Sequence, residues 1–431
     1  MLDSLKRRKN PLFILSSIAL IVVAAFAAGG AAIVFAIILV LLVLFYPFFR
    51  NVWNYFYGAE DISDQRFYAH TEDGWNIAMH FHRPTYPRRG AYPVILSHGI
   101  AVNKFGVDMD RDHSLAYFLA QNGFPVFVLS LRGVGKSYHS SRYRYQDFDF
   151  DDIVEYDVPA VIQKARQLTG APKVNWVGHS MGSMIAMGYM GRKLPGHNDI
   201  ASFVSIAGPG KLDHARQTLW GIFTRYPWIN ELIDFRFSAQ VISPLAGRMN
   251  TPIEDVVLNP ENVNERTVRK LMKNAIENIS RGLARQFVQW METGKETTRD
   301  GQTNYRSCLK NIKVPSLFIA GSRDHVAVPE SVRFAYDQAG SKKKEFILLG
   351  PEAGAHVDYC HTGLVLGDHA IDDVYPRVLE WFETYGMEKD SRGFVARMFH
   401  RIRRRRRRRE LAGDVRRRRR HQGLPPGVIR A

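Results

Sequence analysis

A serine between two glycines is the residue of this chain best placed for covalent chemistry. Gly178, His179 and Gly182 surround Ser180 in a Gly-His-Ser-Met-Gly pentapeptide, which follows an apolar run at 173–177 and precedes a small-residue helical segment. A serine hydroxyl is a poor nucleophile unless a base activates it. In a strand–turn–helix elbow the flanking glycines allow the backbone to approach closely, and the serine projects above the sheet. The pentapeptide therefore predicts Ser180 as a nucleophile, with a purely structural glycine-rich turn as the alternative.

An acid and a base follow the serine in the chain. Apolar runs at 314–320 and 345–349 read as buried strands, and each is followed by a polar loop, the first with Asp324 and the second with His356. In a Ser-His-Asp triad the imidazole takes the serine proton, and the carboxylate fixes the ring and stabilises its positive charge. Acid and base lie past the ends of strands, in the order Ser…Asp…His. We therefore predict that Ser180, Asp324 and His356 form a catalytic triad.

The tetrahedral intermediate of such chemistry needs two donors for its oxyanion. The run at 92–97 reads as a central strand that ends in His98 and Gly99, where a glycine would let the loop fold over the nucleophile. We assign the donors to the backbone N–H groups of Met181 and Ile100. His98 is an alternative base, but its place beside the predicted oxyanion hole favours a loop-bracing role.

These residues need a scaffold, and the chain predicts an α/β fold. Apolar runs alternate with helical segments, which indicates a mostly parallel sheet with helices on both faces and an antiparallel edge formed by the first two strands. The expected strands lie near 64–71, 75–82, 92–97, 125–130, 173–178, 202–207, 314–320 and 344–349. At about 209–305 the pattern becomes helical, which predicts a cap inserted after the sixth strand. Its aromatic and apolar residues form either the core of the cap or an acyl pocket: Trp220, Phe223, Tyr226, Trp228, Ile229, Leu232, Ile233, Phe235 and Phe237.

The chain resembles the α/β-hydrolases over roughly residues 62–386, and within them it is most similar to the acid-lipase group of gastric and lysosomal lipases. The matching residues are His98-Gly99, Ser114–Ala116, Ser130–Gly133, Phe148–Asp151, Tyr156–Ala160, Gly178–Gly182 and Gly354–Asp358. This resemblance implies the α/β-hydrolase fold and hydrolysis of lipophilic esters. It departs from the family at Met181, where glutamine is frequent, but only the backbone of that residue is needed.

Bacterial polyester synthases and depolymerases share this core, and residues 372–381 resemble the end of theirs. The synthases use a cysteine nucleophile, so Ser180 argues against synthesis. Cys308 and Cys360, the only cysteines, lie outside the elbow and are too few for a disulfide framework. The sequence has no spacing of cysteines or histidines typical of a metal site, and we expect neither a metal nor another cofactor.

The N-terminal segment, residues 1–58, is expected to anchor the chain in a membrane. Residues 11–49 are uncharged and apolar, and as one helix they would extend about 58 Å. That is about twice a ~30 Å hydrocarbon core. A Gly-Gly break suggests two spans, near 11–28 and 31–49, although a single pass and a secretion signal are alternatives. Basic residues precede the tract, and Trp53, Tyr55, Phe56 and Tyr57 follow as interfacial aromatics.

The net charge of +17 lies mainly at the ends of the chain. The tail at 391–431 contains 16 arginines and only two acidic residues, so it should repel itself and be disordered when free. Its arginines suit an anionic membrane leaflet, which attracts each nearby basic residue with a binding free energy of about 1 kcal/mol. Nucleic acid is the alternative partner, but the arginine runs at 403–409 and 416–420 have no interleaved aromatics to stack on bases.

Together these features predict a hydrolase domain at 59–390 that cleaves lipophilic esters. We expect the protein to be located in the cytoplasmic membrane, with its catalytic domain on the cytoplasmic side. An acyltransferase or a polyester depolymerase would use the same triad, and a catalytically silent tether between membrane and nucleic acid is an alternative of another class. The oligomeric state and the physiological substrate stay open.

Overall fold

The computed structural model describes residues 37, 40, 41, 45–141, 147–213, 234–248 and 259–388, with only the backbone at 46–50. Nearly all of the predicted membrane tract and the arginine-rich tail lie outside the described residues. The domain limits at residues 59 and 390 stay predictions.

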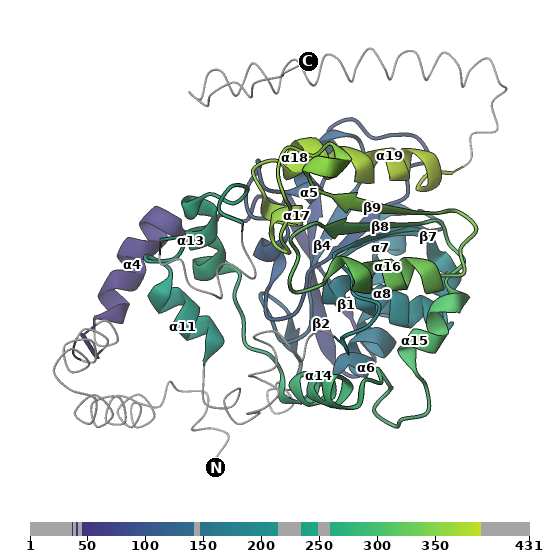
Figure 1. The fold of residues 1–431 in the computed structure, drawn as a ribbon, viewed down its shortest axis with the longest axis horizontal. Helices are drawn as coiled ribbons and strands as arrows, with labels where there is room; N and C mark the ends of the chain where they lie inside the picture. Colours follow the sequence, from purple (N-terminus) through teal and green to yellow (C-terminus); the bar gives the residue numbers. More distant parts are fainter. Residues whose placement is uncertain are drawn as a thin grey trace. The chain divides into compact units, whose positions relative to one another are not determined.

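A twisted, mostly parallel sheet forms the centre of the described part of the chain (Figure 1). Its strands are β1 (Gln65–His70), β2 (Trp75–His82), β3 (Val94–Ser97), β4 (Val126–Ser130), β5 (Tyr138–His139), β6 (Val174–His179), β7 (Ile200–Ile206), β8 (Ser316–Gly321) and β9 (Lys344–Leu349). Their order is β1-β2-β4-β3-β6-β7-β8-β9, with the short β5 paired to β2. The eight predicted strands are confirmed, as is the antiparallel edge, because β1 pairs antiparallel with β2.

The central strands of the sheet are buried on both faces, whereas the edge strand β9 is partly exposed. Every residue of β3, β4 and β6 is buried, as expected for parallel strands covered by helices on either side. The edge strand β9 instead exposes part of its length and carries Lys344 and Glu345, charges that discourage pairing with another sheet. The strands that lead to Gly99 and to Ser180, β3 and β6, are therefore in the least exposed part of the sheet.

The helices cover the sheet and supply a cap. They are α4 (Tyr46–Tyr57), α5 (Leu115–Gln121), α6 (Phe150–Asp152), α7 (Val158–Thr169), α8 (Met181–Gly191), α11 (Phe235–Ile242), α13 (Glu265–Asn274), α14 (Arg281–Thr293), α15 (Tyr305–Cys308), α16 (Pro329–Gln338), α17 (Gly363–Leu366), α18 (Ala370–Asp373) and α19 (Tyr375–Tyr385). In Figure 1, α19 and α16 lie on opposite sides of β8 and β9. The predicted layering of helices on both faces is confirmed.

The described part of the cap is helical, as predicted, and consists of α11, α13 and α14 with their connections. Phe235 and Phe237 begin α11. The other aromatic and apolar residues that we assigned to a cap core or an acyl pocket, at 220–233, lie outside the described residues.

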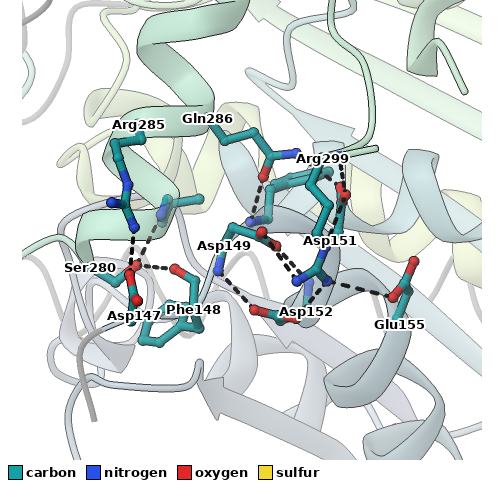
Figure 2. A network of polar contacts seen from close by, with 12 residues as sticks. Asp147, Phe148, Asp149, Asp151, Asp152, Glu155, Ser280, Arg285, Gln286 and Arg299 are labelled. Atoms are coloured by element: carbon teal, nitrogen blue, oxygen red, sulfur yellow. Dashed lines mark hydrogen bonds and ion pairs between the residues drawn. The ribbon is translucent and has the colours of Figure 1, made fainter. Parts of the chain in front are cut away.

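A polar network ties the base of the cap to the segment 147–155 of the core (Figure 2). The Arg299 guanidinium lies 2.6 Å from Asp152 and 3.3 Å from Asp149. Gln286 of α14 accepts from the Phe150 N–H at 2.9 Å, and its Nε2 donates to Asp151 at 3.0 Å. Exposed ion pairs contribute little singly, but the buried amide of Gln286 matches both the Phe150 N–H and the Asp151 carboxylate. The residues that carry the acid-lipase resemblance at 148–151 thus anchor the cap.

The helix α4 leads from the predicted membrane tract into the domain. It begins at Tyr46, inside the predicted second span, and packs against the cap helix α13 (Figure 1). Of the interfacial aromatics, Tyr55 is 86% exposed and Phe56 55% exposed. Within the described residues, no helix combines the length and apolar character needed to span a bilayer.

Candidate active site

Ser180 lies on a strained turn between β6 and α8. Its φ of 55° is in the left-handed region, which is unusual for a residue with a side chain. A Cβ atom at Gly178 would lie 2.3 Å from Ser183 N, and one at Gly182 would lie 2.4 Å from Ser97 O, so both positions require glycine. The structure therefore has the strand, the sharp turn and the helix that the pentapeptide predicts.

His179, the residue before the serine, supports a second loop. Its Nε2 lies 3.1 Å from the carbonyl oxygen of His361, and the two ring centroids are 4.7 Å apart. Burial, and then the neighbouring His361 ring, hold the pKa of His179 well below its usual value. His179 is therefore neutral and donates from Nε2. This contact brings His361 to the elbow.

Asp324 pairs with His361. The Asp324 Oδ2 atom lies 2.8 Å from His361 Nδ1, and both side chains are almost fully buried. The other oxygen, Oδ1, accepts from the N–H groups of Val326 at 2.9 Å and Ala327 at 2.8 Å. A carboxylate held in this way keeps the proton on Nδ1 and leaves Nε2 of the neutral ring as the basic nitrogen.

His356 lies elsewhere, and this corrects the expected pairing with Asp324. His356 Nδ1 is 2.8 Å from Asp373 Oδ1, its backbone N–H donates to Asp373 Oδ2 at 2.9 Å, and its side chain is 55% exposed. Its ring stacks on His369 with centroids 5.0 Å apart. A 3₁₀ turn over Pro351–Ala353 and a left-handed Gly354 direct this part of the loop toward α18. The structure thus separates His356 from Asp324.

Sequence reasoning missed His361, although a physical signal for it was present. Two histidines lie on the loop between β9 and α17, and chain order alone does not distinguish them. His356 lies in a turn rich in glycine, alanine and proline, which is typical of an exposed loop. His361 instead comes just before the run Gly363–Leu366, which is buried in α17. Since a catalytic imidazole is held by packed surroundings, the histidine beside the apolar run was the better candidate.

The loop after β3 lies against the serine. A Cβ atom at Gly99 would be 3.0 Å from Ser180 Cβ and 3.5 Å from Ser180 Oγ, so glycine is needed for this approach. Met181 is the first residue of α8, where backbone N–H groups have no partner within the helix. Among the described residues, no acceptor is recorded for the N–H of Met181 or of Ile100. Both groups remain candidates for oxyanion donors.

His98 braces this loop and has no nitrogen left to act as a base. Its Nδ1 lies 2.8 Å from Gly99 O, and its Nε2 accepts from the Leu131 N–H at 3.0 Å. Burial lowers the pKa of His98 to about 4. The neutral ring thus links the loops after β3 and β4, which agrees with the loop-bracing interpretation.

A family model described as alpha/beta hydrolase fold matches residues 92–354. This match covers more than half of the chain, and the chain therefore belongs to the alpha/beta hydrolase family. The described residues contain no group of three or more histidine, cysteine, aspartate or glutamate side chains able to hold a metal ion.

Lipases are among the similar proteins. Lipase 1 of Drosophila melanogaster is 36% identical over 118 residues, which are 26% of this chain and 26% of that protein. Triacylglycerol lipase 2 of Arabidopsis thaliana is 24% identical over 363 residues, 73% of this chain and 83% of that protein. The lysosomal acid lipase/cholesteryl ester hydrolase of Homo sapiens is 30% identical over 131 residues, 28% of this chain and 33% of that protein. The chain thus spans well under two thirds of the fly and human relatives, and the predicted resemblance to acid lipases is confirmed.

Proposed function

We propose that the chain is a membrane-anchored serine hydrolase that cleaves carboxylic esters with a lipophilic acyl part. The observation that carries this proposal is the buried Asp324–His361 pair, with 2.8 Å between Oδ2 and Nδ1, held beside the elbow through His179. The triad of the proposal is therefore Ser180, His361 and Asp324, with His361 in the place for which the sequence suggested His356.

The proposed reaction has two halves. His361 Nε2 takes the proton of Ser180 while Oγ attacks the ester carbonyl, and the oxyanion accepts hydrogen bonds from the Met181 and Ile100 N–H groups. His361 then gives its proton to the departing alcohol, which leaves an acyl-serine. A water molecule, deprotonated by His361, attacks the acyl carbon, and collapse of the second intermediate releases the acid and restores Ser180. Asp324 stabilises the imidazolium that forms in both halves.

The substrate class rests on two supports. The similar proteins named above are lipases of different organisms, and the apolar N-terminal tract suits an enzyme that meets its substrate in a membrane. An acyltransferase would use the same acyl-serine with another acceptor, and a polyester depolymerase would use it on a polymer. The three candidate enzymes therefore share the triad, and they differ in which molecule accepts the acyl group and in whether the substrate is a polymer.

A fluorophosphonate probe tests the nucleophile. The full chain should be labelled at Ser180, and Ser180→Ala should remove labelling and ester turnover while its thermal unfolding stays close to that of wild type. Ser307→Ala, at an exposed serine, is the matched control and should label normally. Unlabelled wild-type protein would refute the proposal and favour a silent tether. Nitrophenyl esters from acetate to palmitate, a soluble polyester and added alcohol acceptors then separate the three enzymatic candidates.

The membrane part of the proposal places the apolar tract as an integral hairpin in the cytoplasmic membrane, with the domain and the tail on the cytoplasmic side. The protein should resist extraction by alkaline carbonate. Protease added outside right-side-out vesicles should not digest the domain, and digestion would favour a single pass.

The proposed partner of the arginine-rich tail is anionic lipid. The full chain, reconstituted with its domain outward, should bind added anionic vesicles at low salt and release them at high salt. Deleting residues 399–431 should remove this binding and leave hydrolysis of a short ester unchanged. Tail-dependent binding to duplex DNA without binding to vesicles would favour nucleic acid instead.

A further inference from the structure

One asparagine at the end of the cap helix α13 holds the chain where it leaves α4. Asn274 Nδ2 donates to Tyr57 O at 2.8 Å, and Asn274 Oδ1 accepts from the Ala59 N–H at 3.1 Å. A carboxamide offers a donor and an acceptor at the same time, which both contacts require. The Arg269 guanidinium, also from α13, lies 5.8 Å from the centre of the Tyr57 ring. The direction in which the chain leaves α4 is thus fixed to the cap through Asn274.

The same residue holds the loop that follows β3. The backbone carbonyl of Asn274 accepts from Asn103 Nδ2 at 2.8 Å, and this amide also donates to Glu277 Oε1 at 2.7 Å. Residues 275–277 then pair in antiparallel fashion with residues 101–103 through two backbone hydrogen bonds of 2.9 Å each. Asn274 therefore stands at the start of the cap segment that fixes this loop.

The loop held in this way is the one that faces Ser180. Gly99 lies against the serine side chain, as described above, and the N–H of Ile100 is a proposed oxyanion donor. Ala101, the next residue, has a φ of 59°, a left-handed conformation that costs on the order of 1 kcal/mol and persists only where the surroundings impose it. The hydrogen bonds from the cap supply those surroundings. Loss of the cap contacts would therefore let Ala101 relax and turn the Ile100 N–H away.

The helix on the other side of Asn274 is suited to a lipid surface. The apolar tract at 11–49 runs directly into α4, and Tyr55 and Phe56 on that helix are largely exposed. Aromatic side chains of this kind sit at the level of the lipid head groups. A bilayer is thus the partner that fits α4, because the helix continues the segment that enters it.

We propose that Asn274 is a positioning residue that transmits the seating of α4 at a bilayer to the oxyanion loop. This inference rests on the proposed function, since it concerns how efficiently the same site stabilises its oxyanion. Asn274 touches no reacting atom. Its side chain holds the chain after α4, and its backbone carbonyl, together with the segment 275–277, holds the loop. Because a displacement of an oxyanion donor by about 1 Å can reduce the rate roughly 100-fold, the loss should appear in kcat and leave KM unchanged.

The test uses the full chain and a short soluble ester. Asn274→Ala should lower kcat about tenfold, which is about 1.4 kcal/mol of transition-state stabilisation. Asn278→Ala removes the same side chain from a cap residue that contacts Asp234 and Arg236 and neither α4 nor the loop, and it should leave kcat unchanged. Asn103→Ala combined with Asn274→Ala should lose no more than the larger single loss, because both act through one connection. An unchanged kcat in Asn274→Ala, or an equal loss in Asn278→Ala, would overturn the assignment.

The role of the bilayer has a separate measurement. Wild-type kcat should be higher in vesicles of phosphatidylethanolamine and phosphatidylglycerol than in detergent micelles, and Asn274→Ala should bring this ratio close to one. A wild-type ratio of one, or a ratio that the substitution leaves unchanged, would overturn the coupling. Fluorophosphonate labelling of wild type keeps the two levels apart: if Ser180 is not labelled, the proposed function fails. If Ser180 is labelled and Asn274→Ala behaves as wild type, only the inference about Asn274 fails.

Discussion

Two histidines on the loop that follows β9 each pair with an aspartate from elsewhere in the chain, and the two hydrogen bonds have the same length. Asp324 Oδ2 is 2.8 Å from His361 Nδ1, and Asp373 Oδ1 is 2.8 Å from His356 Nδ1. Their surroundings differ. The His361 side chain is 9% exposed and its carboxylate 0%, whereas the His356 side chain is 55% exposed. The same bond is thus made once inside the domain and once at its surface.

A carboxylate beside a histidine therefore does not by itself define a catalytic pair. The oxygens of Asp324 are used by two backbone N–H groups and by one imidazole, so this carboxylate orients a ring that lies beside the elbow. The oxygens of Asp373 accept from His356 and from the hydroxyl of Tyr359 at 2.9 Å. That carboxylate ties two positions of the same loop together, and its role is to shape the loop that carries His361.

Removing each histidine in turn tests the distinction between the two pairs most directly. His361→Ala should reduce kcat roughly 10⁶-fold, close to the loss in Ser180→Ala, because members of a triad act as a unit. His356→Ala, at the surface, should change kcat by no more than about twofold. Initial rates on a short soluble ester measure both. A larger loss in His356→Ala would reverse the assignment of the base.

Substituting the two aspartates should also lower kcat by unequal amounts, with the larger loss at Asp324, and both losses should be smaller than that of His361→Ala. Asp324→Asn should reduce kcat about 10⁴-fold, since an amide favours the wrong tautomer of the imidazole. Asp373→Asn should reduce kcat no more than about tenfold, because it only displaces the loop that carries His361. The ratio of the two losses is the informative quantity, and equal losses would contradict the distinction drawn here.

The loop-shaping role of Asp373 predicts an effect on stability more than on turnover. Tyr359→Phe removes a buried hydroxyl that donates to this carboxylate, and should lower the free energy of unfolding by about 1–2 kcal/mol. The kcat of this variant should stay near that of wild type. Urea denaturation compares it with Tyr138→Phe at an exposed tyrosine, which should be neutral. If Tyr359→Phe is as stable as its control, Asp373 does not depend on that bond.

A third histidine differs from both of these in that it contacts two carboxylates. His113 Nδ1 lies 2.8 Å from Asp110, and Nε2 lies 2.9 Å from Asp368. Burial alone would lower the pKa of His113, but the two carboxylates outweigh it and raise the pKa to about 9. Since the folded pKa exceeds the unfolded one, this contribution to stability is complete below about pH 6.5 and is lost as pH rises through 9.

A pKa raised from 6.5 to about 9 corresponds to a contribution of at most about 3 kcal/mol. Urea denaturation at pH 6 and above pH 9 should show that wild type loses more stability between the two conditions than His113→Gln does. The difference between the variants isolates His113 from the lysines and tyrosines that titrate in the same range. Parallel losses in wild type and in His113→Gln would show that this histidine is not charged in the folded protein.

Sequence patterns predicted the strands well because most of the strands are apolar runs bounded by turns. The same reasoning placed Ser180 directly after β6 and Asp324 in the turn that follows β8, since such positions depend little on the rest of the chain. The base could not be chosen in this way. His356 and His361 both follow β9, and their positions depend on the turn at Pro351–Ala353 and on the distant partner Asp373. Contacts between residues that are not neighbours in the sequence determine which histidine pairs with Asp324, and the local sequence pattern does not contain that information.

The end of the domain is attached to its central strand. The carbonyl of Gly386 accepts from the N–H of Tyr92, just before β3, at 3.1 Å, and from Asn175 Nδ2 of β6 at 2.9 Å. These contacts join parts of the chain that are made early and late during synthesis. Contacts of such long range slow folding, so a ribosome-bound chain that lacks α19 holds β3 and β6 without their last partners. We therefore expect the domain to reach its final packing only after residue 386 has been made, although β1 to β9 all precede it.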